Sequence, residues 1–387
     1  MPEKITDTIS FIGANDPSLD LFESQYRVPH GVSYNSYIID APKLTVMDTI
    51  DKRKSDEWLQ NAEAVINGRP VDYLVIQHLE PDHSATIDLF LDKHPETKIV
   101  CSAKAKDMLP NFISHPVGDN VIAVKEGDTL DLGDRTLSFV AAPMVHWPEV
   151  IMTYDNKDKV LFSADGFGKF GTRNADEIWD DEARRYYFNI VGKYGMQVQN
   201  VLKKAAGLDI EIIAPLHGPT LSGDLSHYLH LYDTWSKYQP ESEGIFIAVA
   251  SIHGHTNVVA DRLAQILREK GQKVVLMDLT REDIHEAVSN CFRYPKSVFV
   301  ACSYDAGVFP PMERLLHILT HKFFRNRTVA LVENGSWAPS AAKTMKNILE
   351  GCKDLTFVEP VVTIRTTMKD TDIPKLEELA DHLIEAK

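Results

Sequence analysis

Cysteine is scarce in this sequence and widely spaced. The 387 residues include four cysteines, and no two of them form a C-x-x-C pair. That spacing argues against a disulfide framework, a thiolate zinc site and an iron–sulfur site. We therefore interpret Cys101, Cys291, Cys302 and Cys352 as small, buried apolar residues.

Positive charge and long apolar runs are also in short supply. Lysine and arginine number 41 against 56 aspartates and glutamates, which gives a formal net charge of −15. Such a surface repels phosphates on average, so we expect no nucleic-acid partner. The opening MPEKITDTISF lacks a basic segment followed by an apolar one, and no later run approaches the roughly 18 apolar residues of a spanning helix. We expect no membrane association and a cytoplasmic location.

The length of the chain favours two domains, because 387 residues exceed the size at which one hydrophobic core keeps growing. The first part carries short apolar stretches that are typical of strands and are separated by turn-forming residues. They cover residues 34–40, 44–50, 72–77, 98–103, 121–130, 136–142, 150–155, 159–165 and 210–216. Helical patterns lie between some of them, at residues 55–67 and 181–206. This mixture predicts a layered α/β sandwich.

The polar segment YQPESEG, residues 238–244, is where we place the domain boundary. After it come short, nearly continuous apolar runs of the kind that fills a parallel sheet buried on both faces. They cover residues 244–251, 273–279, 297–303 and 328–334. Helical patterns separate these runs, which predicts a doubly wound parallel sheet. The predicted domains are therefore residues 1–240 and 244–387.

The motif QHLEPDH places four potential metal ligands directly after the apolar run YLVI. These ligands are His78, Glu80, Asp82 and His83. On an irregular loop at the end of a buried strand, their side chains can converge on one point. The packing of a hydrophobic core does not require such a cluster.

Three more candidates follow, and each ends an apolar strand just before a glycine or proline: His146, Asp165 and His217. Taken singly, a histidine or aspartate after a strand is more often a turn or capping residue. The recurrence of the pattern makes coincidence improbable. We therefore predict a metal site on one rim of the sandwich.

These residues resemble a known family. Metallo-β-lactamase-like hydrolases carry H-x-H-x-D-H and bind two zinc ions, whereas Glu80 here gives H-x-E-x-D-H, the signature of flavodiiron proteins. A shell of three carboxylates and four imidazoles is harder and more anionic, which suits iron. The resemblance implies one iron on His78, Glu80 and His146 and a second on Asp82, His83 and His217, with Asp165 bridging them. In some family members the histidine that matches His83 is turned away from the metal.

The second part carries three loops at strand ends. The first precedes a helix, so its backbone N–H groups and the helix dipole can hold a phosphate; it resembles the FMN-phosphate loop of flavodoxins. The other two match in position the loops that flank the flavin ring, and Tyr304 or Trp337 could stack on it. The residues of the three loops are Ser251, Ile252, His253, Gly254, His255 and Thr256; Ser303, Tyr304, Asp305, Ala306 and Gly307; and Asn334, Gly335, Ser336 and Trp337.

The resemblance covers essentially the whole chain and implies a fold and a function. The fold would be a metallo-β-lactamase-like αββα sandwich followed by a flavodoxin-like doubly wound parallel sheet. The function would be reduction of dioxygen to water, of nitric oxide to nitrous oxide, or of both, with electrons passing through FMN to two non-haem irons. The donor would be rubredoxin, a flavin reductase or reduced deazaflavin, and the protein would form a head-to-tail homodimer or a dimer of dimers.

Two other functions fit parts of this sequence. The first is a dizinc hydrolase of the metallo-β-lactamase type with an appended flavodoxin domain, and Glu80 in place of a histidine argues against it. The second is an electron carrier without catalysis. Seven intact candidate ligands argue against that, because a carrier needs only the flavin domain.

Overall fold

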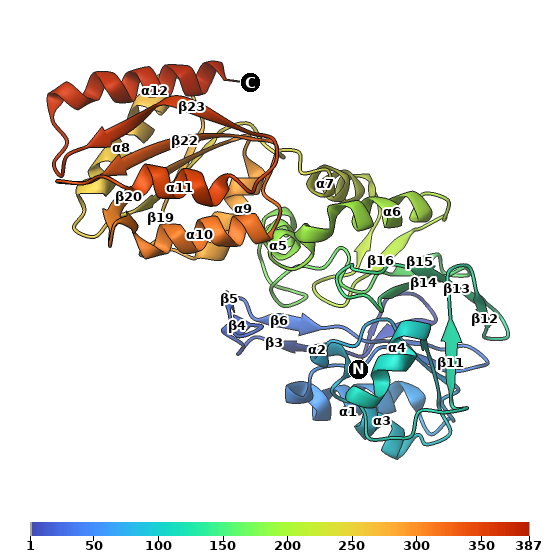
Figure 1. Cartoon of the computed structure of the whole chain (residues 1–387). Coiled ribbons are helices and arrows are strands. Elements are labelled where there is room, and N and C mark those ends of the chain that lie inside the picture. The colour runs from blue at the N-terminus through green and yellow to red at the C-terminus, as the bar shows by residue number, and fades with distance from the viewer. Residues whose placement is uncertain (1, 387) are drawn as a thin grey trace. The chain divides into compact units, whose positions relative to one another are not determined.

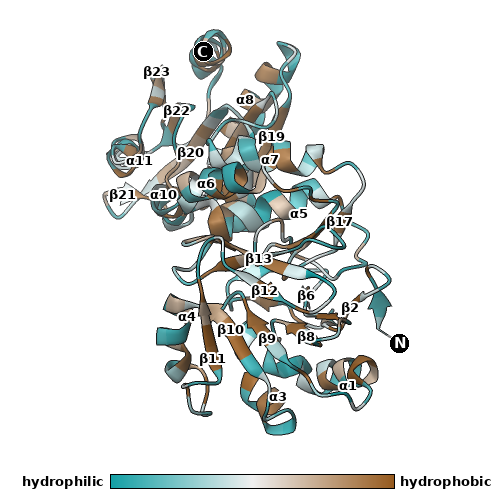
Figure 2. Cartoon of the chain, turned by 90° about the vertical axis from the view of Figure 1, so that its right-hand side faces the viewer, coloured by the Kyte–Doolittle hydropathy of each residue, from teal (hydrophilic) through white to brown (hydrophobic). Residues whose placement is uncertain are grey.

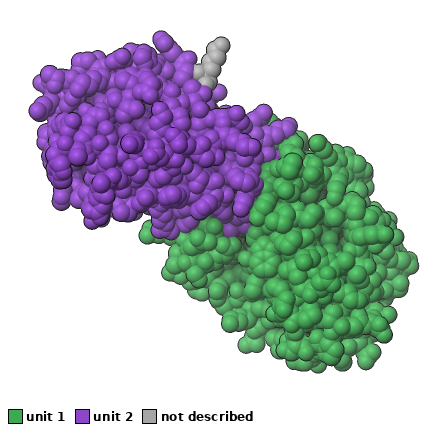
Figure 3. Space-filling model, in the orientation of Figure 1, with its two compact units in different colours: residues 1–187, 194–233 green, residues 188–193, 234–387 purple. Residues whose placement is uncertain are grey.

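The computed structural model describes residues 2–386, and the chain divides into two compact units (Figure 3). The first unit comprises Met1–Tyr187 and Tyr194–Asp233, and the second comprises Phe188–Lys193 and Thr234–Lys387. Among residues 2–386, no helix has both the length and the apolar character needed to cross a membrane. Cys101 and Cys291 are buried as predicted, whereas Cys302 and Cys352 are partly exposed.

The first unit is built on two sheets. The first sheet has the order β1 (Glu3–Lys4), β2 (Ile9–Phe11), β7 (Tyr37–Ile39), β8 (Thr45–Met47), β9 (Tyr73–Ile76), β10 (Lys98–Ser102) and β11 (Val121–Val124). The second has the order β12 (Thr129–Asp131), β13 (Thr136–Ala141), β14 (Ile151–Asp155), β15 (Val160–Phe162), β16 (Ile212–Ala214) and β17 (Leu221–Ser222). Strands β8 to β11 are parallel to one another.

The core of this unit lies between the two sheets. Leu137 and Phe139 alternate along β13 with the half-buried Thr136 and Ser138, so one face of the strand is apolar. Both pack into a cluster with buried side chains of the first sheet, such as Val100 on β10. Figure 2 shows the apolar character of β10 and β11 in brown. Two short strand pairs lie outside the sheets: β3 (Ala14–Asp16) with β6 (Val32–Tyr34), and β4 (Leu21–Phe22) with β5 (Tyr26–Arg27).

Helices flank the sheets. Those of the first unit are α1 (Ser55–Ile66), α2 (Pro81–Ser84), α3 (Ile87–Lys93), α4 (Ala103–Met108), α5 (Trp179–Tyr186), α6 (Gly195–Ala205) and α7 (Ser226–Ser236), whose last turn belongs to the second unit. Short 3-10 turns are η1 (Lys52–Lys54) and η2 (Leu109–Asn111). On α1, Trp58 and Ile66 are buried, and the Trp58 ring packs 5.6 Å from that of Phe90 on α3. The layered sandwich that the sequence predicts is confirmed.

The second unit is a parallel sheet with helices on both faces. Its strand order is β19 (Val274–Asp278), β18 (Ile245–Ala250), β20 (Lys296–Tyr304), β22 (Arg327–Asn334) and β23 (Leu355–Ile364), and β21 (Gly307–Val308) pairs with the end of β20. Helices α8 (His255–Glu269) and α12 (Ile373–Glu385) cover one face, and α9 (Ile284–Arg293), α10 (Pro310–His321) and α11 (Ala341–Leu349) cover the other (Figure 1). A 3-10 turn, η5 (Asp370–Asp372), precedes α12. The predicted doubly wound sheet is confirmed, and its strand order reverses beside β18, where such sheets bind ligands.

Two stretches differ from the sequence-based expectation. The helix predicted over residues 181–206 is interrupted after α5 by a π-helical turn, η3 (Tyr187–Val191), and a 3-10 turn, η4 (Gly192–Tyr194), before α6 begins. Glycines 192 and 195 favour a break, because glycine weakens a helix interior. The predicted strand 121–130 is two strands, β11 and β12, separated by a turn at Gly127, whose φ is +79°.

Candidate functional site

The loop after β9 is held by a buried carboxylate. Gln77 donates hydrogen bonds to Asp48 from its backbone N–H at 2.7 Å and from its side-chain amide at 2.8 Å. Asp48 is fully buried, so these bonds fix the point at which the loop leaves the sheet. His78 follows directly, and Pro81 begins α2, which carries Asp82 and His83.

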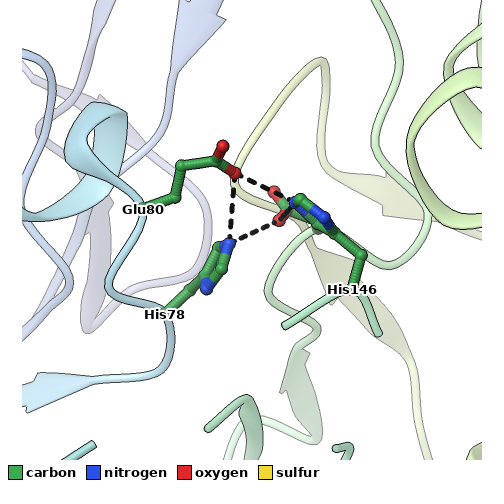
Figure 4. Close-up of side chains that lie close together, drawn as sticks. His78, Glu80 and His146 are labelled. Atoms are coloured by element: carbon green, nitrogen blue, oxygen red, sulfur yellow. Dashed lines mark hydrogen bonds and ion pairs between the residues drawn. The ribbon is translucent and has the colours of Figure 1, made fainter. Parts of the chain in front are cut away.

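Two imidazoles and two carboxylates meet in a first group. His78 Nε2 lies 3.3 Å from Glu80 Oε2, and His146 Nε2 lies 2.9 Å from the same oxygen. Asp165 Oδ2 lies 3.2 Å from His78 Nε2 and 3.3 Å from His146 Nε2. Figure 4 shows the side chains of His78, Glu80 and His146 pointing toward one another. These four residues could hold one metal ion.

Asp82, His83 and His217 form a second group that could hold a metal ion. Asp82 Oδ2 lies 3.5 Å from His83 Nε2 and 3.3 Å from His217 Nε2. The other oxygen of Asp165, Oδ1, faces this group, at 3.4 Å from His83 Nε2 and 3.6 Å from His217 Nε2. One carboxylate therefore presents one oxygen to each group. The fold brings together all seven residues that the sequence singles out.

The site carries charge in a buried place. Burial alone would raise the pKa of the Asp165 carboxyl, but His78 and His146 beside it outweigh burial and hold that pKa well below its usual range. Burial likewise opposes ionisation of Glu80, yet hydrogen bonds from His146 and His78 lower its pKa to about 2. For His146, burial lowers the pKa and contacts with Asp165 and Glu80 raise it to about 9. Glu80 and Asp165 therefore stay ionised and draw positive charge to the site.

Several buried polar atoms here make no hydrogen bond within the described residues. Both oxygens of Asp82, both oxygens of Asp165 and both ring nitrogens of His83 are in this state. A buried polar group without a partner is costly, so such a cluster calls for an explanation. Imidazole nitrogens and carboxylate oxygens aimed at common points are a donor set that fits divalent first-row metals. The residues present therefore fit two metal ions.

Contacts behind the imidazoles select which nitrogen faces the site. His78 Nδ1 lies 2.8 Å from Glu149 Oε1, and His217 Nδ1 lies 2.7 Å from the backbone oxygen of Ser33. With acceptors there, Nδ1 carries the proton and Nε2 offers a lone pair to the site. Sequence reasoning missed Asp48, Ser33 and Glu149. No sequence signal marks them, because each acts on a residue far along the chain.

Aromatic rings pack against histidines of both groups. The rings of Phe22 and Tyr186 lie 5.2 Å and 5.7 Å from that of His217, and Trp147 lies 5.2 Å from His78. Burial and the charge of Asp165 raise the pKa of Tyr186 well above its usual value, so its hydroxyl keeps its proton. Apolar surroundings of this kind limit the access of water and strengthen electrostatic interactions inside the site.

The second unit has a pocket of about 510 Å³ at the carboxyl ends of its strands, a volume within the usual range for small-molecule sites. Ser251 Oγ accepts hydrogen bonds from the backbone N–H groups of Gly254 and Thr256, at 3.0 and 3.2 Å, and shapes the loop before α8. The pocket is lined by the following residues that the sequence predicts: Ser251, Ile252, His253, His255, Thr256, Ser303, Tyr304, Asp305, Ala306, Asn334, Gly335, Ser336 and Trp337. The pocket thus unites the three predicted loops.

The lining of this pocket differs from the prediction in two ways, because two predicted residues are absent from it and four other residues are present. Gly254 and Gly307 do not line the pocket, whereas Cys302, Ala338, Ser340 and Thr366 do. Gly254 has a φ of +88° and serves the turn into α8. Asn334 accepts a hydrogen bond from Thr366 N at 2.9 Å and donates one to its oxygen at 2.8 Å. These two hydrogen bonds hold the loop after β23 at the pocket. The sequence patterns do not predict the strand β23.

Comparison with known proteins is consistent with both sites. Residues 32–218 match the family described as ODP family beta lactamase. The anaerobic nitric oxide reductase flavorubredoxin of Salmonella typhi is 32% identical over an alignment of 364 residues that covers 89% of this chain and 74% of that protein. The flavodiiron protein of Giardia intestinalis has a TM-score of 0.93 at 25% identity, covering 99% of this chain and 97% of that one. Rubredoxin oxygen:oxidoreductase from Desulfovibrio gigas gives 0.91 at 26%, covering 99% and 98%.

Proposed function

Since the chain belongs to the flavodiiron protein family, we propose that it is an oxidoreductase that reduces dioxygen to water, nitric oxide to nitrous oxide, or both. Two relatives support the two substrates by their names, one a nitric oxide reductase and the other an oxygen oxidoreductase. The observation that carries the proposal is the position of Asp165, whose two oxygens face two separate groups of potential ligands.

The proposed metal ligands follow from these groups. His78, Glu80 and His146 would hold one iron, and Asp82, His83 and His217 would hold the other, with Asp165 between them. His83 is included because its Nε2 faces the carboxylates of Asp82 and Asp165. Three of the seven ligands are carboxylates, which are hard ligands. They favour iron over zinc, which accepts softer ligands.

The pocket of the second unit is the proposed FMN site. The backbone N–H groups at the start of α8 would hold the phosphate, and the exposed rings of Tyr304 and Trp337 would contact the flavin. When bound, the two ferrous ions would supply one electron each and reduced FMN would supply two, which together meet the four-electron demand of dioxygen. The proposed metal-binding domain is residues 1–240 and the proposed flavin domain is residues 244–387. The compact units divide nearby, after Asp233, and the second unit also takes in Phe188–Lys193.

In the metal centre the protein would contribute charge, orientation and exclusion of water. The low pKa of Glu80 keeps that carboxylate available to a cation at ordinary pH. Phe22 and Trp147 pack against the histidines beside them with their ring planes nearly perpendicular. Tyr186 keeps a protonated hydroxyl in the same surroundings, which suits a donor rather than a base.

Partners follow from the family. The electron donor would be rubredoxin, a separate flavin reductase or reduced deazaflavin. A head-to-tail homodimer, alone or paired into a dimer of dimers, would bring the flavin of one subunit to the irons of the other. Around the pocket, Trp337 is 89% exposed and Tyr304 45% exposed, which supports contact of this rim with a partner.

Turnover tests the proposed function directly. The purified protein, loaded with iron and FMN, is supplied anaerobically with a chemically reduced flavin donor and then with dioxygen or nitric oxide. We expect consumption of at least one gas with matching oxidation of the donor, and loss of that activity after iron is removed by a chelator. A fully loaded protein that consumes neither gas would overturn the proposal.

The rival hydrolase has a distinct outcome in the same preparation. It would bind zinc in preference to iron and hydrolyse ester or amide model substrates without a reductant. Hydrolysis by the zinc form, together with no gas consumption by the iron form, would favour it.

A further inference from the structure

Glu149 is a buried carboxylate behind the first group of candidate ligands. It lies in the loop between β13 and β14, three residues after His146, and its side chain is completely buried. Its Oε1 accepts a hydrogen bond from His78 Nδ1 at 2.8 Å and another from the backbone N–H of Leu79 at 3.0 Å. Glu149 does not point into the group itself, because the opposite nitrogen of His78 faces Glu80 and Asp165.

We propose that Glu149 is a positioning residue that fixes His78 with its Nε2 free and makes the His78, Glu80 and His146 position the tighter of the two metal positions. The inference rests on the proposed two-metal site and adds a difference between its halves. A carboxylate that accepts the Nδ1 proton of a ligating histidine sets its tautomer and raises its basicity as a ligand.

The second group lacks this support. His217 Nδ1 donates to the neutral backbone oxygen of Ser33. His83 Nδ1 makes no hydrogen bond within residues 2–386. A hydrogen bond to an ionised acceptor is roughly twice as strong as one to a neutral acceptor. Metal bound by His78 therefore gains support that metal bound by His217 or His83 does not.

Packing alone does not account for a carboxylate at residue 149. Its second oxygen, Oε2, is buried and makes no hydrogen bond within the described chain. Burying a charge in this state is costly unless a cation compensates it. A glutamine would accept both bonds now made by Oε1 without carrying the charge. A role in packing does not require the negative charge of Glu149. A role in supporting a metal ligand does require it.

The test compares metal binding by full-length variants. Protein freed of metal is titrated anaerobically with Co²⁺ as the probe, and anomalous diffraction at one cobalt per chain gives the occupancy of each position. For the unaltered chain we expect two binding steps, with the first ion at the His78 position. Glu149→Ala should weaken one step by roughly 10–100-fold and leave the other within roughly twofold. At one cobalt per chain the ion should then move toward His217.

Two further variants separate charge from structure. Glu149→Gln keeps the hydrogen bonds, so we expect ¹⁵N spectra of His78 to show the same tautomer while cobalt affinity falls to an intermediate value. Ser102→Ala removes the 2.7 Å hydrogen bond from Ser102 Oγ to the backbone oxygen of Glu149 without touching the carboxylate. This control should lower the temperature of unfolding and leave both cobalt affinities unchanged.

The outcomes discriminate between the inference and the function on which it rests. Unchanged affinities in Glu149→Ala, or equal losses in Glu149→Ala and Ser102→Ala, would overturn the role of Glu149. If Glu149→Ala fails to fold, Glu149→Gln decides alone, and wild-type affinity in that variant would refute the proposal. Failure of the unaltered chain to bind any metal would instead overturn the proposed function.

Discussion

The two candidate sites of this chain are held in opposite ways. In the first unit, side chains make the site: His78, His83 and Asp165 are buried, and their atoms already converge on common points. In the second unit, backbone and shape make the site, and Trp337 and Tyr304 stand largely or partly in solvent. A metal site needs particular atoms at particular distances, whereas a phosphate loop needs backbone N–H groups, which every residue except proline supplies.

This difference predicts that damage in one unit spares the other. The metal site should fail abruptly when one carboxylate is lost, because its charges depend on one another. The flavin pocket should weaken in proportion to the contact removed, because many small contacts share the binding. Variants in each unit, assayed for both cofactors, test this contrast.

Asp165→Ala should have the largest effect. The variant removes one of three carboxylates and the residue that faces both groups. We expect loss of at least one iron and a fall in gas turnover beyond the roughly 10–100-fold that loss of a supporting contact costs. FMN should stay bound and reducible. Metal analysis, flavin spectra and oxygen-electrode rates on one preparation decide it, with Asp165→Asn as the control for size.

A result against the bridging role is easy to define. If Asp165→Ala retains two irons and near-normal turnover, the two groups do not depend on this carboxylate.

Gly254→Asp tests the second unit. A carboxylate at the start of α8 would repel the FMN phosphate, and we expect FMN affinity to fall by at least roughly tenfold. Gly254 has a φ of +88°, so any side chain also adds strain of about 1–2 kcal/mol. A Cβ there meets no atom within 4 Å, so Gly254→Ala isolates the strain. FMN content after dialysis and iron content measure the two sites, and unchanged FMN in the aspartate variant would mean that the loop is misplaced.

Glu80→His should change the choice of metal more than the amount bound. It restores the H-x-H-x-D-H pattern, removes a carboxylate whose pKa is about 2 and softens the shell, so zinc should compete better with iron. FMN should be unaffected. Competition between the two metals, measured by elemental analysis, checks this, with Glu80→Gln as the charge-matched control. Full iron occupancy and an unchanged oxidase rate in Glu80→His would show that Glu80 does not discriminate between the metals.

The smallest expected effect is the release of a proton from His146 when metal binds. The pKa of His146 is raised to about 9 in the metal-free chain, so this imidazole is protonated at pH 7.5. A metal ion needs the neutral ring, so binding should release this proton, and affinity should rise with pH up to about 9. Calorimetry in buffers of different ionisation enthalpy measures the release. Metal affinity that does not change between pH 6.5 and 9 would contradict the assigned role of His146.

The contrast between the units also explains what the sequence could predict. His146, Asp165 and His217 were visible because chemistry requires their residue types at strand ends. Glu149 was not, because it resembles an ordinary loop glutamate until the fold brings it against His78. Proximity across 71 positions of the chain is a property of packing rather than of local pattern.

Other features of the second unit could not be predicted from the sequence. Strand β23 carries Glu359 and Pro360 and lies at the edge of the sheet, where proline is tolerated but the apolar pattern is broken. Without that strand, Thr366 could not be placed beside Asn334. Gly254 and Gly307 are predicted as lining residues, whereas Gly254 serves the turn into α8 and Gly307 begins β21. Parallel strands and helix faces were predictable because burial on both sides dictates their composition.

Counting the metal ions and flavins per chain in one purified preparation checks both site assignments at once. Protein made in iron-replete cells is analysed for iron, zinc and FMN per chain. We predict a yellow protein with about two irons and one FMN, since the first unit offers two groups of ligands around Asp165 and the second offers one pocket. Zinc as the main metal would contradict the diiron assignment, and absence of FMN would contradict the assignment of the pocket.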